Sequence, residues 1–329
     1  MNIGDAENIL IIRLSSLGDI LLTTPLLRSL KNLYPGIKID FLIRTEYADV
    51  LKFNPYVNEV LLYKRDDNKE LFQHLKSKKY GAVVDLQNNL RSRKIIKGVH
   101  APAFKFDKRS FDKFLLVKFK INRLQKAPQI PQRYASSIPG FMLDDKGLDL
   151  FLPEDQTVSL KADGSYIAFC PGSRHFTKMW PPEYYTSLGK LLQKEGFDVV
   201  LLGGKSDREI CRRLSEEIPG SVDMSNDDDL FLTAAFMKQC RMVVCNDSGL
   251  MHAACAAGVP VLAIFGSTVK EFGFTPYNNK NLILENNSLS CRPCSHIGRE
   301  NCPLGHFKCM LEITPQAVLD NVKRMLDLS

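Results

Sequence analysis

Residues 243–268, VVCNDSGLMHAACAAGVPVLAIFGST, constrain the fold more than any other stretch of the chain. An apolar strand is expected to end at Cys245, and a helix of small residues is expected over 250–257. Gly258-Val259-Pro260 ends that helix, and a second apolar strand follows at 261–265. Two buried strands joined by one helix form a βαβ unit, so this stretch predicts a parallel sheet covered by helices.

The turn between the first strand and the helix carries polar groups suited to a ligand. Asp247, Ser248 and Gly249 stand where free N–H groups and the partial positive charge of a helix N-terminus are expected, and His252 follows in the first turn. Each has an ordinary alternative, with Asp247 or Ser248 as a helix cap and His252 as an interior histidine. Polar residues at 267–268, after the next strand, favour a continuous rim for a ligand with hydroxyls and phosphates, such as a nucleotide sugar.

Strands and helices alternate over residues 8–86 and again from residue 166, residues 87–150 are less regular, and 329 residues are enough chain for two domains. We expect buried strands at 8–13, 37–43, 57–63, 82–86, 166–170, 198–202 and 261–265. A stretch rich in Pro, Asp and Gly at 153–164 predicts a linker. The sequence therefore predicts an α/β protein with two Rossmann-like domains facing across a cleft. Their expected bounds are 1–155 and 164–312, followed by a C-terminal helix at 313–329, for which packing back on the N-terminal domain is one placement.

Positive charge is concentrated in the first half of the chain. Residues 1–160 hold 26 Lys and Arg against 18 Asp and Glu, whereas residues 161–329 hold 18 against 19. We therefore expect the first half to meet an anionic partner. No nucleic-acid motif accompanies this charge. The basic and apolar stretch 111–121 suits a helix on a membrane interface, and a core-facing helix with solvated lysines is the alternative.

Targeting and membrane segments are not expected. No apolar run reaches the roughly 18 residues of a membrane helix, and the N-terminus lacks a basic region ahead of an apolar one. These features indicate a cytoplasmic protein. Asp227-Asp228-Asp229 precedes a helix, so a charge run with a cap is favoured there over a metal site, and we expect no catalytic metal.

The nine cysteines, an odd number, do not predict a disulfide framework. Cys291, Cys294, Cys302 and Cys309 lie close in sequence, with His296 or His306 nearby. A structural zinc site is one interpretation of this spacing, and reduced packing thiols are the other.

Loops after three further strands hold candidate chemistry. Asp19, after Gly18, is either a helix cap or a general base for a hydroxyl proton. In PGSRHFTKMWP, at 171–181, Arg174 and Lys178 could bind a diphosphate and stabilise it as it leaves, or form a solvated basic loop. After Gly203-Gly204, Asp207 or Glu209 could hold ribose hydroxyls.

These loops, in this order, resemble glycosyltransferase family nine, the ADP-heptose:lipopolysaccharide heptosyltransferases. The segments that carry the likeness are RLSSLGDILLTTPLLRSLK, DLQNNLRS, PGSRHFTKMWP and CNDSGLMHAACAAGVPVLAIFGST, and the cysteine-rich tail looks like an insertion of the heptosyltransferase II-type members. The resemblance covers nearly the whole chain. It implies a GT-B fold, a nucleotide-sugar donor in the C-terminal domain and an acceptor in the N-terminal one. It also implies an inverting, metal-independent transfer without a covalent intermediate or a cofactor.

Carried over by position, the resemblance implies catalytic roles for Asp19, as the base, and for Lys178. The implied donor-binding residues are Ser173, Arg174, Lys178, Asp207, Glu209, Asp247, Ser248, Gly249 and His252, and those for the acceptor are Arg13 and Arg91. The implied acceptor is a phosphorylated, lipid-linked saccharide of the lipopolysaccharide inner core. That acceptor would place the protein peripherally at the inner face of the cytoplasmic membrane, with no nucleic-acid partner.

Other functions stay open at this point. One is a family member that uses another nucleotide sugar, because the loops indicate phosphate and ribose more clearly than base or sugar. A second is a non-catalytic nucleotide-sugar-binding protein. A third is nucleic-acid binding by the basic half, which would show a steep salt dependence.

Overall fold

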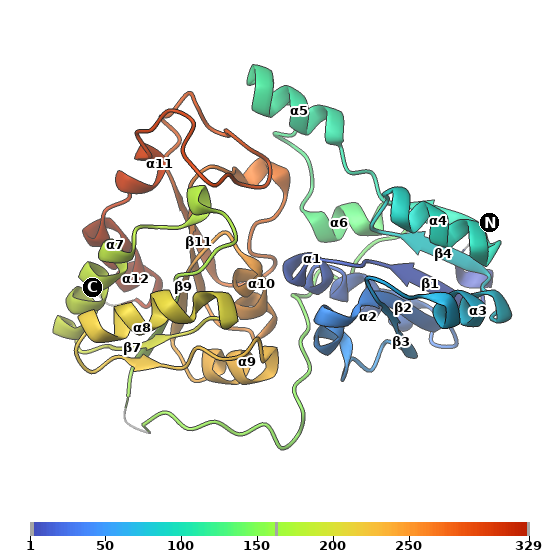
Figure 1. Ribbon diagram of the computed structural model, residues 1–329, viewed down its shortest axis with the longest axis horizontal. Coiled ribbons are helices and arrows are strands. Elements are labelled where there is room, and N and C mark those ends of the chain that lie inside the picture. Colours follow the sequence, from blue (N-terminus) through green and yellow to red (C-terminus); the bar gives the residue numbers. More distant parts are fainter. Residues whose placement is uncertain (1–2, 162–163, 328–329) are drawn as a thin grey trace. The chain divides into compact units, whose positions relative to one another are not determined.

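The computed structural model describes residues 3–161 and 164–327 of the chain. It divides into two compact units, unit 1 (Met1–Arg109 and Pro128–Phe151) and unit 2 (Ser110–Ala127 and Leu152–Ser329). Each unit holds one sheet whose paired strands all run parallel (Figure 1). The predicted α/β class is confirmed. The expected linker at 153–164 includes residues 162 and 163, which lie outside the described residues.

Unit 1 has the strand order β3-β2-β1-β4-β5. Its strands are β1 (Asn8–Ile12), β2 (Lys38–Arg44), β3 (Glu59–Tyr63), β4 (Ala82–Asp85) and β5 (Ala103–Lys105). Its helices are η1 (Ile3–Asp5), α1 (Leu17–Leu21), α2 (Thr24–Leu33), η2 (Thr45–Leu51), α3 (Lys69–Ser77), α4 (Leu90–Val99) and α6 (Ile130–Ala135). Because the order reverses between β1 and β4, the loops that follow these two strands diverge and leave room for a ligand.

Unit 2 has the strand order β11-β10-β9-β6-β7-β8. Its strands are β6 (Tyr166–Cys170), β7 (Asp198–Leu201), β8 (Val222–Asp223), β9 (Met242–Asn246), β10 (Val261–Phe265) and β11 (Asn281–Glu285). Its helices are α5 (Ser110–Phe119), η3 (Phe176–Lys178), α7 (Pro182–Lys194), η4 (Lys205–Asp207), α8 (Arg208–Glu217), α9 (Leu230–Lys238), α10 (Gly249–Ala256), η5 (Lys270–Phe272), α11 (Lys308–Leu311) and α12 (Pro315–Met325). The predicted βαβ unit is β9-α10-β10, and here the order reverses between β6 and β9.

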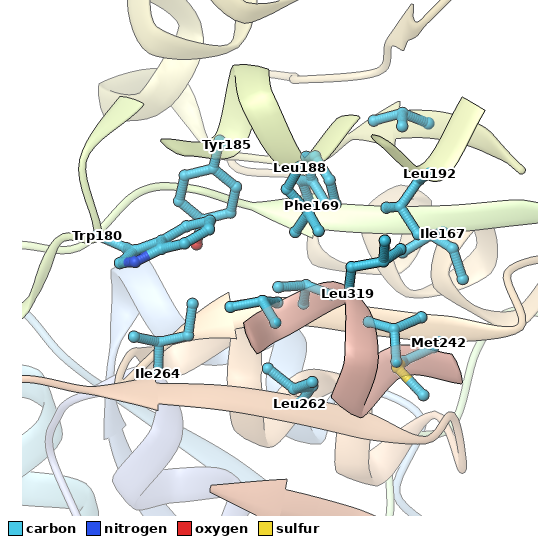
Figure 2. Close-up of a cluster of buried hydrophobic side chains, with 14 of the residues drawn as sticks. Ile167, Phe169, Trp180, Tyr185, Leu188, Leu192, Met242, Leu262, Ile264 and Leu319 are labelled. Atoms are coloured by element: carbon cyan, nitrogen blue, oxygen red, sulfur yellow. The ribbon is translucent and has the colours of Figure 1, made fainter. Parts of the chain in front are cut away.

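The last helix, α12, belongs to the core of unit 2. Val318, Leu319 and Val322 are buried on one face of α12 and join a cluster with Trp180, Tyr185 and strand residues of the sheet (Figure 2). α12 packs mainly against α7. The C-terminal helix therefore packs in the core of unit 2, and its expected return to the N-terminal domain stays a prediction.

The segment 110–127 also departs from the expected division, because it packs with unit 2 although it lies within the first half of the sequence. Leu116 and Leu124 form a small buried cluster with Phe272. The Nζ of Lys120 donates hydrogen bonds to the carbonyl oxygens of Cys291 (3.0 Å) and Pro293 (2.7 Å). In the parts of the chain that the structure describes, no helix is long and apolar enough to cross a membrane.

Candidate functional site

Each sheet reversal brings predicted site residues to one end of its sheet. In unit 1, Arg13 follows β1 directly, Asp19 lies in α1, and Arg91 lies in the first turn of α4, the helix after β4. In unit 2, the loop after β6 carries Lys178, and the turn after β9 carries Asp247. These are the positions where parallel α/β sheets bind ligands, because the connections there leave the sheet on opposite faces.

Asp19 in unit 1 lies at the start of α1, where it forms an ion pair with Arg13 and caps the helix. An Nη2–Oδ1 distance of 2.5 Å joins Arg13 to Asp19, and the Asp19 side chain is 17% exposed. The other oxygen, Oδ2, accepts hydrogen bonds from Ser16 N (3.2 Å) and Ser16 Oγ (2.8 Å). The Asp19 side chain therefore caps α1 through one oxygen and forms an ion pair with Arg13 through the other.

Electrostatics keep the Asp19 carboxyl ionised. Burial alone would raise its pKa, but the positive charge of Arg13 and the hydrogen bonds from Ser16 outweigh burial and lower the pKa of Asp19. A half-buried carboxylate held in the charged form can accept a proton from a hydroxyl during bond formation.

The two predicted acceptor-binding arginines have different surroundings. Arg13 is buried, and besides Asp19 it binds the carbonyl oxygen of Leu86 through Nη1 (2.7 Å). Arg91 is exposed, with its guanidinium carbon 5.8 Å from the ring centroid of Tyr63. Arg13 thus forms its ion pair with Asp19 directly. The acceptor-binding role of both arginines stays a prediction.

Lys108, which the sequence analysis did not single out, is half-buried in unit 1. Burial and the positive charge of Arg13 lower the pKa of Lys108, and Asp85 and Asp19 oppose this shift. Lys108 lies in the basic first half of the chain, and nothing in the sequence distinguishes it from the other lysines there.

Lys178 and Asp247 meet in unit 2. Lys178 Nζ lies 2.7 Å from Asp247 Oδ2, and the two side chains are 14% and 9% exposed. Thr268 Oγ1 donates to the same Asp247 oxygen (2.6 Å), so residues from the loops after β6, β9 and β10 converge on one carboxylate. The N-cap position of α10 belongs to Ser248, and the Asp247 carboxylate is engaged by Lys178 and Thr268.

The start of α10 is open to an anionic or hydroxyl ligand. Ser248 occupies the N-cap position without a side-chain cap hydrogen bond, and Gly249 is the first helical residue. Ser248 Oγ is buried and has no hydrogen-bond partner in the part of the chain that the structure describes. His252 is buried in the first turn of this helix. Free first-turn amides beside an unpaired hydroxyl suit phosphate or sugar oxygens.

The loop 171–181 is fixed at both ends by the buried Asn246. Asn246 Nδ2 donates to Pro171 O (2.7 Å), and Asn246 Oδ1 accepts from Trp180 N (3.0 Å). Between these anchors Ser173 is half-buried and Arg174 is exposed. A loop anchored in this way presents its cations in a defined place, and this role of Asn246 was not recognised from the sequence.

The two candidate ribose-binding acids differ in position. Asp207 is half-buried beside Gly172, where a Cβ would lie 2.1 Å from Asp207 Oδ1, so a larger residue at 172 would displace the Asp207 carboxylate. Burial raises the pKa of Asp207. Glu209 is exposed on α8 and pairs with Arg212 (2.8 Å). Asp207 thus borders the loop that carries Lys178.

Two groups of residues were considered as metal sites from the sequence, the aspartate run 227–229 and the clustered cysteines. Asp229 Oδ1 accepts from Leu232 N (2.9 Å) and caps α9, and Asp227 pairs with Arg208, which confirms the charge run with a cap. Among residues 3–161 and 164–327, no group of three or more His, Cys, Asp or Glu is arranged to hold a metal ion. The cysteines 291, 294, 302 and 309 are free thiols.

Comparisons with known proteins identify relatives over nearly the whole chain. The model of glycosyltransferase family 9 (heptosyltransferase) matches residues 69–304. Lipopolysaccharide heptosyltransferase 2 of Salmonella typhimurium is 26% identical, and the alignment covers 97% of this chain and 98% of that protein.

Two solved structures share the fold. ADP-heptose lipopolysaccharide heptosyltransferase II of E. coli has a TM-score of 0.73 at 24% identity, over 97% of this chain and 98% of that one. Heptosyltransferase WaaC of E. coli, solved with ADP-2-deoxy-2-fluoro heptose, has a TM-score of 0.71 at 21% identity, over 96% and 99% of the two chains. These structural similarities establish the common architecture of two parallel α/β sheets.

Proposed function

The chain belongs to glycosyltransferase family 9, and we propose that it transfers heptose from ADP-heptose to a hydroxyl of the lipopolysaccharide inner core. The observation that carries the proposal is the Lys178–Asp247 pair at the β6/β9 reversal, beside the open start of α10. The names of the relatives supply the heptose donor and the lipopolysaccharide acceptor.

The reaction is a single displacement that inverts the anomeric carbon. The acceptor oxygen forms the new bond to that carbon as its bond to the diphosphate breaks. The hydroxyl proton passes to Asp19, and ADP leaves with the bonding electrons. Lys178 stabilises the negative charge that develops on the leaving diphosphate. No metal or cofactor takes part in this proposal.

The remaining predicted contacts have assigned roles. Ser173 and Arg174 bind the diphosphate together with Lys178, and either Asp207 or Glu209 holds the ribose hydroxyls. Asp247, Ser248, Gly249 and His252 bind the heptose and phosphate oxygens. Arg91 binds the acceptor, and Arg13 acts on the acceptor side by holding Asp19.

A direct assay tests the function. ADP release from ADP-heptose is measured with a series of truncated lipopolysaccharide acceptors, and UDP- and GDP-sugars are compared as donors. We expect release that depends on both ADP-heptose and one acceptor length. Equal or greater release from another donor would favour a different nucleotide sugar. ADP binding without transfer to any acceptor would favour the non-catalytic alternative.

The ion pair with Arg13 predicts a pH effect. In Arg13→Gln, the positive charge that lowers the pKa of Asp19 is lost while burial remains, so the pKa rises. Because Asp19 works as the carboxylate, the acid limb of the pH profile of kcat/KM moves to higher pH, and activity is lost first under acidic conditions. Arg91→Gln is the control and leaves the acid limb in place. An unmoved limb in Arg13→Gln would contradict the base assignment.

We propose that the protein is cytoplasmic and associates peripherally with the inner membrane through α5 and the residues that follow it. Phe111, Phe114, Phe119 and Ile121 are 50–64% exposed, although Leu116 of the same helix is buried. Segment 110–127 also contains five Lys and Arg but only one Asp. Aromatic rings with flanking lysines suit an anionic bilayer surface, where each basic residue contributes about 1 kcal/mol.

Vesicle binding tests this surface. Changing Phe111, Phe114 and Phe119 together to Ser should reduce co-sedimentation with phosphatidylglycerol vesicles at least tenfold, because the inserted rings are lost. The matched control changes Leu33, Phe53 and Leu62, exposed apolar residues of unit 1, to Ser and should bind as the unmodified protein does. Equal binding by both variants would exclude α5 as the membrane contact. A change in oligomeric state only in the α5 variant would instead indicate a second copy on this face.

A further inference from the structure

Arg292 is a buried arginine that joins the ends of two neighbouring strands in unit 2. Its side chain is 4% exposed and pairs with Glu285 (2.8 Å). Arg292 Nε donates to Gly266 O (2.6 Å), Nη2 to Thr268 O (2.8 Å) and Nη1 to Asn286 O (2.5 Å). One planar guanidinium therefore fixes the chain that leaves β10 and β11.

The position of Thr268 connects Arg292 to the donor site. Arg292 holds the Thr268 carbonyl, and the Thr268 hydroxyl donates to Asp247. Asp247 in turn pairs with Lys178. A continuous series of short contacts thus runs from a residue without any predicted role to the lysine proposed to meet the diphosphate.

The cysteine-rich segment, residues 286–309, holds the opposite loop as well. Thr177, next to Lys178, donates from its N to Arg299 O (3.1 Å), and Thr177 Oγ1 accepts from Arg299 N (2.8 Å). Ser267 N donates to Thr177 O (3.2 Å), and Cys294 N donates to Ser267 O (3.2 Å). A Cβ on Gly266 would lie 2.7 Å from Thr177 O, so the two loops touch through backbone atoms.

We propose that Arg292 is a positioning residue for transfer, acting through Thr268 to hold Asp247 and Lys178 at the donor diphosphate. This inference rests on the proposed function of that site. On this inference, the cysteine-rich segment holds the loops after β6 and β10 in place through hydrogen bonds. Lysine cannot replace Arg292, because a single ammonium lacks the planar fork that reaches three carbonyls and a carboxylate together.

A double-mutant cycle tests the proposal. Arg292→Lys should lower kcat about 10- to 100-fold, the loss that a misplaced reacting group produces, with less than a threefold change in the donor KM. In a Lys178→Ala background, Arg292→Lys should lower kcat by a smaller factor than it does in the unmodified protein, because one of the two groups that it positions is already absent. Thr268→Val, which keeps the carbonyl and removes the hydroxyl, should lower kcat and show the same non-additivity.

The controls separate positioning from general damage. Leu319→Ala opens a cavity in the core of unit 2 and removes no hydrogen bond of these loops. It should lower the Tm and leave kcat unchanged below the unfolding transition. Losses from Arg292→Lys and Lys178→Ala that multiply would overturn the positioning role, as would full kcat in Thr268→Val. Full turnover in Lys178→Ala itself would reject the proposed donor site, and with it this inference.

Discussion

Asp19→Asn is expected to lower kcat about 100- to 10,000-fold, the range for loss of a general base. The amide keeps the shape of the side chain and can still accept from Ser16, but it cannot take the acceptor proton. The affinity for ADP should stay within twofold of the unmodified protein, because Asp19 lies in unit 1 and the predicted donor contacts lie in unit 2. Turnover with saturating donor and acceptor, and calorimetry with ADP, measure the two quantities.

Ser16→Ala is the matched control for Asp19→Asn. It removes the Ser16 Oγ–Asp19 hydrogen bond but leaves the carboxylate and its ion pair with Arg13. If Asp19 only caps α1, both variants lose stability and neither loses much turnover. A kcat for Asp19→Asn within a few-fold of the unmodified protein would therefore reduce Asp19 to a cap.

Lys178→Ala is expected to reduce kcat about 100- to 1,000-fold, as when one preorganised donor to a developing charge is removed. The effect on ADP affinity should be smaller, because the negative charge on the diphosphate grows as the glycosidic bond breaks. Rates of ADP release across donor concentrations separate kcat from KM. Lys194→Ala, an exposed lysine at the end of α7, removes the same charge from the same unit without contacting the donor loops.

The opposite pattern would change the assignment of Lys178. A large rise in the donor KM with an unchanged kcat would show that Lys178 binds the substrate and its transition state equally well. The lysine would then be a donor-binding residue without a catalytic role. The Lys194→Ala control should show neither effect.

Local patterns predicted the strands and the site loops. The apolar runs at 8–13, 166–170 and 261–265 became strands because their residues suit burial on both faces of a parallel sheet. Polar turns directly after these strands then lie at one sheet edge, which is why Asp19, Lys178 and Asp247 were recognised. What the sequence could not supply was their pairing, since Lys178 and Asp247 meet only through the strand order β9-β6.

Other features depended on packing that no local pattern encodes. Residues 17–33 form two helices, α1 and α2, because the hydroxyls of Thr23 and Thr24 donate to the carbonyls of Ile20 and Leu21, and Pro25 has no N–H. In α5, apolar residues occupy more than one face, so periodicity does not reveal that Leu116 is the buried one. The bonds of Arg292 to three separate carbonyls are equally invisible in the sequence.

The membership of segment 110–127 in unit 2 means that the polypeptide passes between the two units three times, near residues 109, 127 and 151. If the chain were divided once, near residue 152, the C-terminal part would lack Leu116 and Leu124, and Phe272 would be exposed. A hybrid enzyme that takes unit 2 from a relative should therefore take residues 110–127 together with all residues after 151. Otherwise apolar side chains around Phe272 would be exposed.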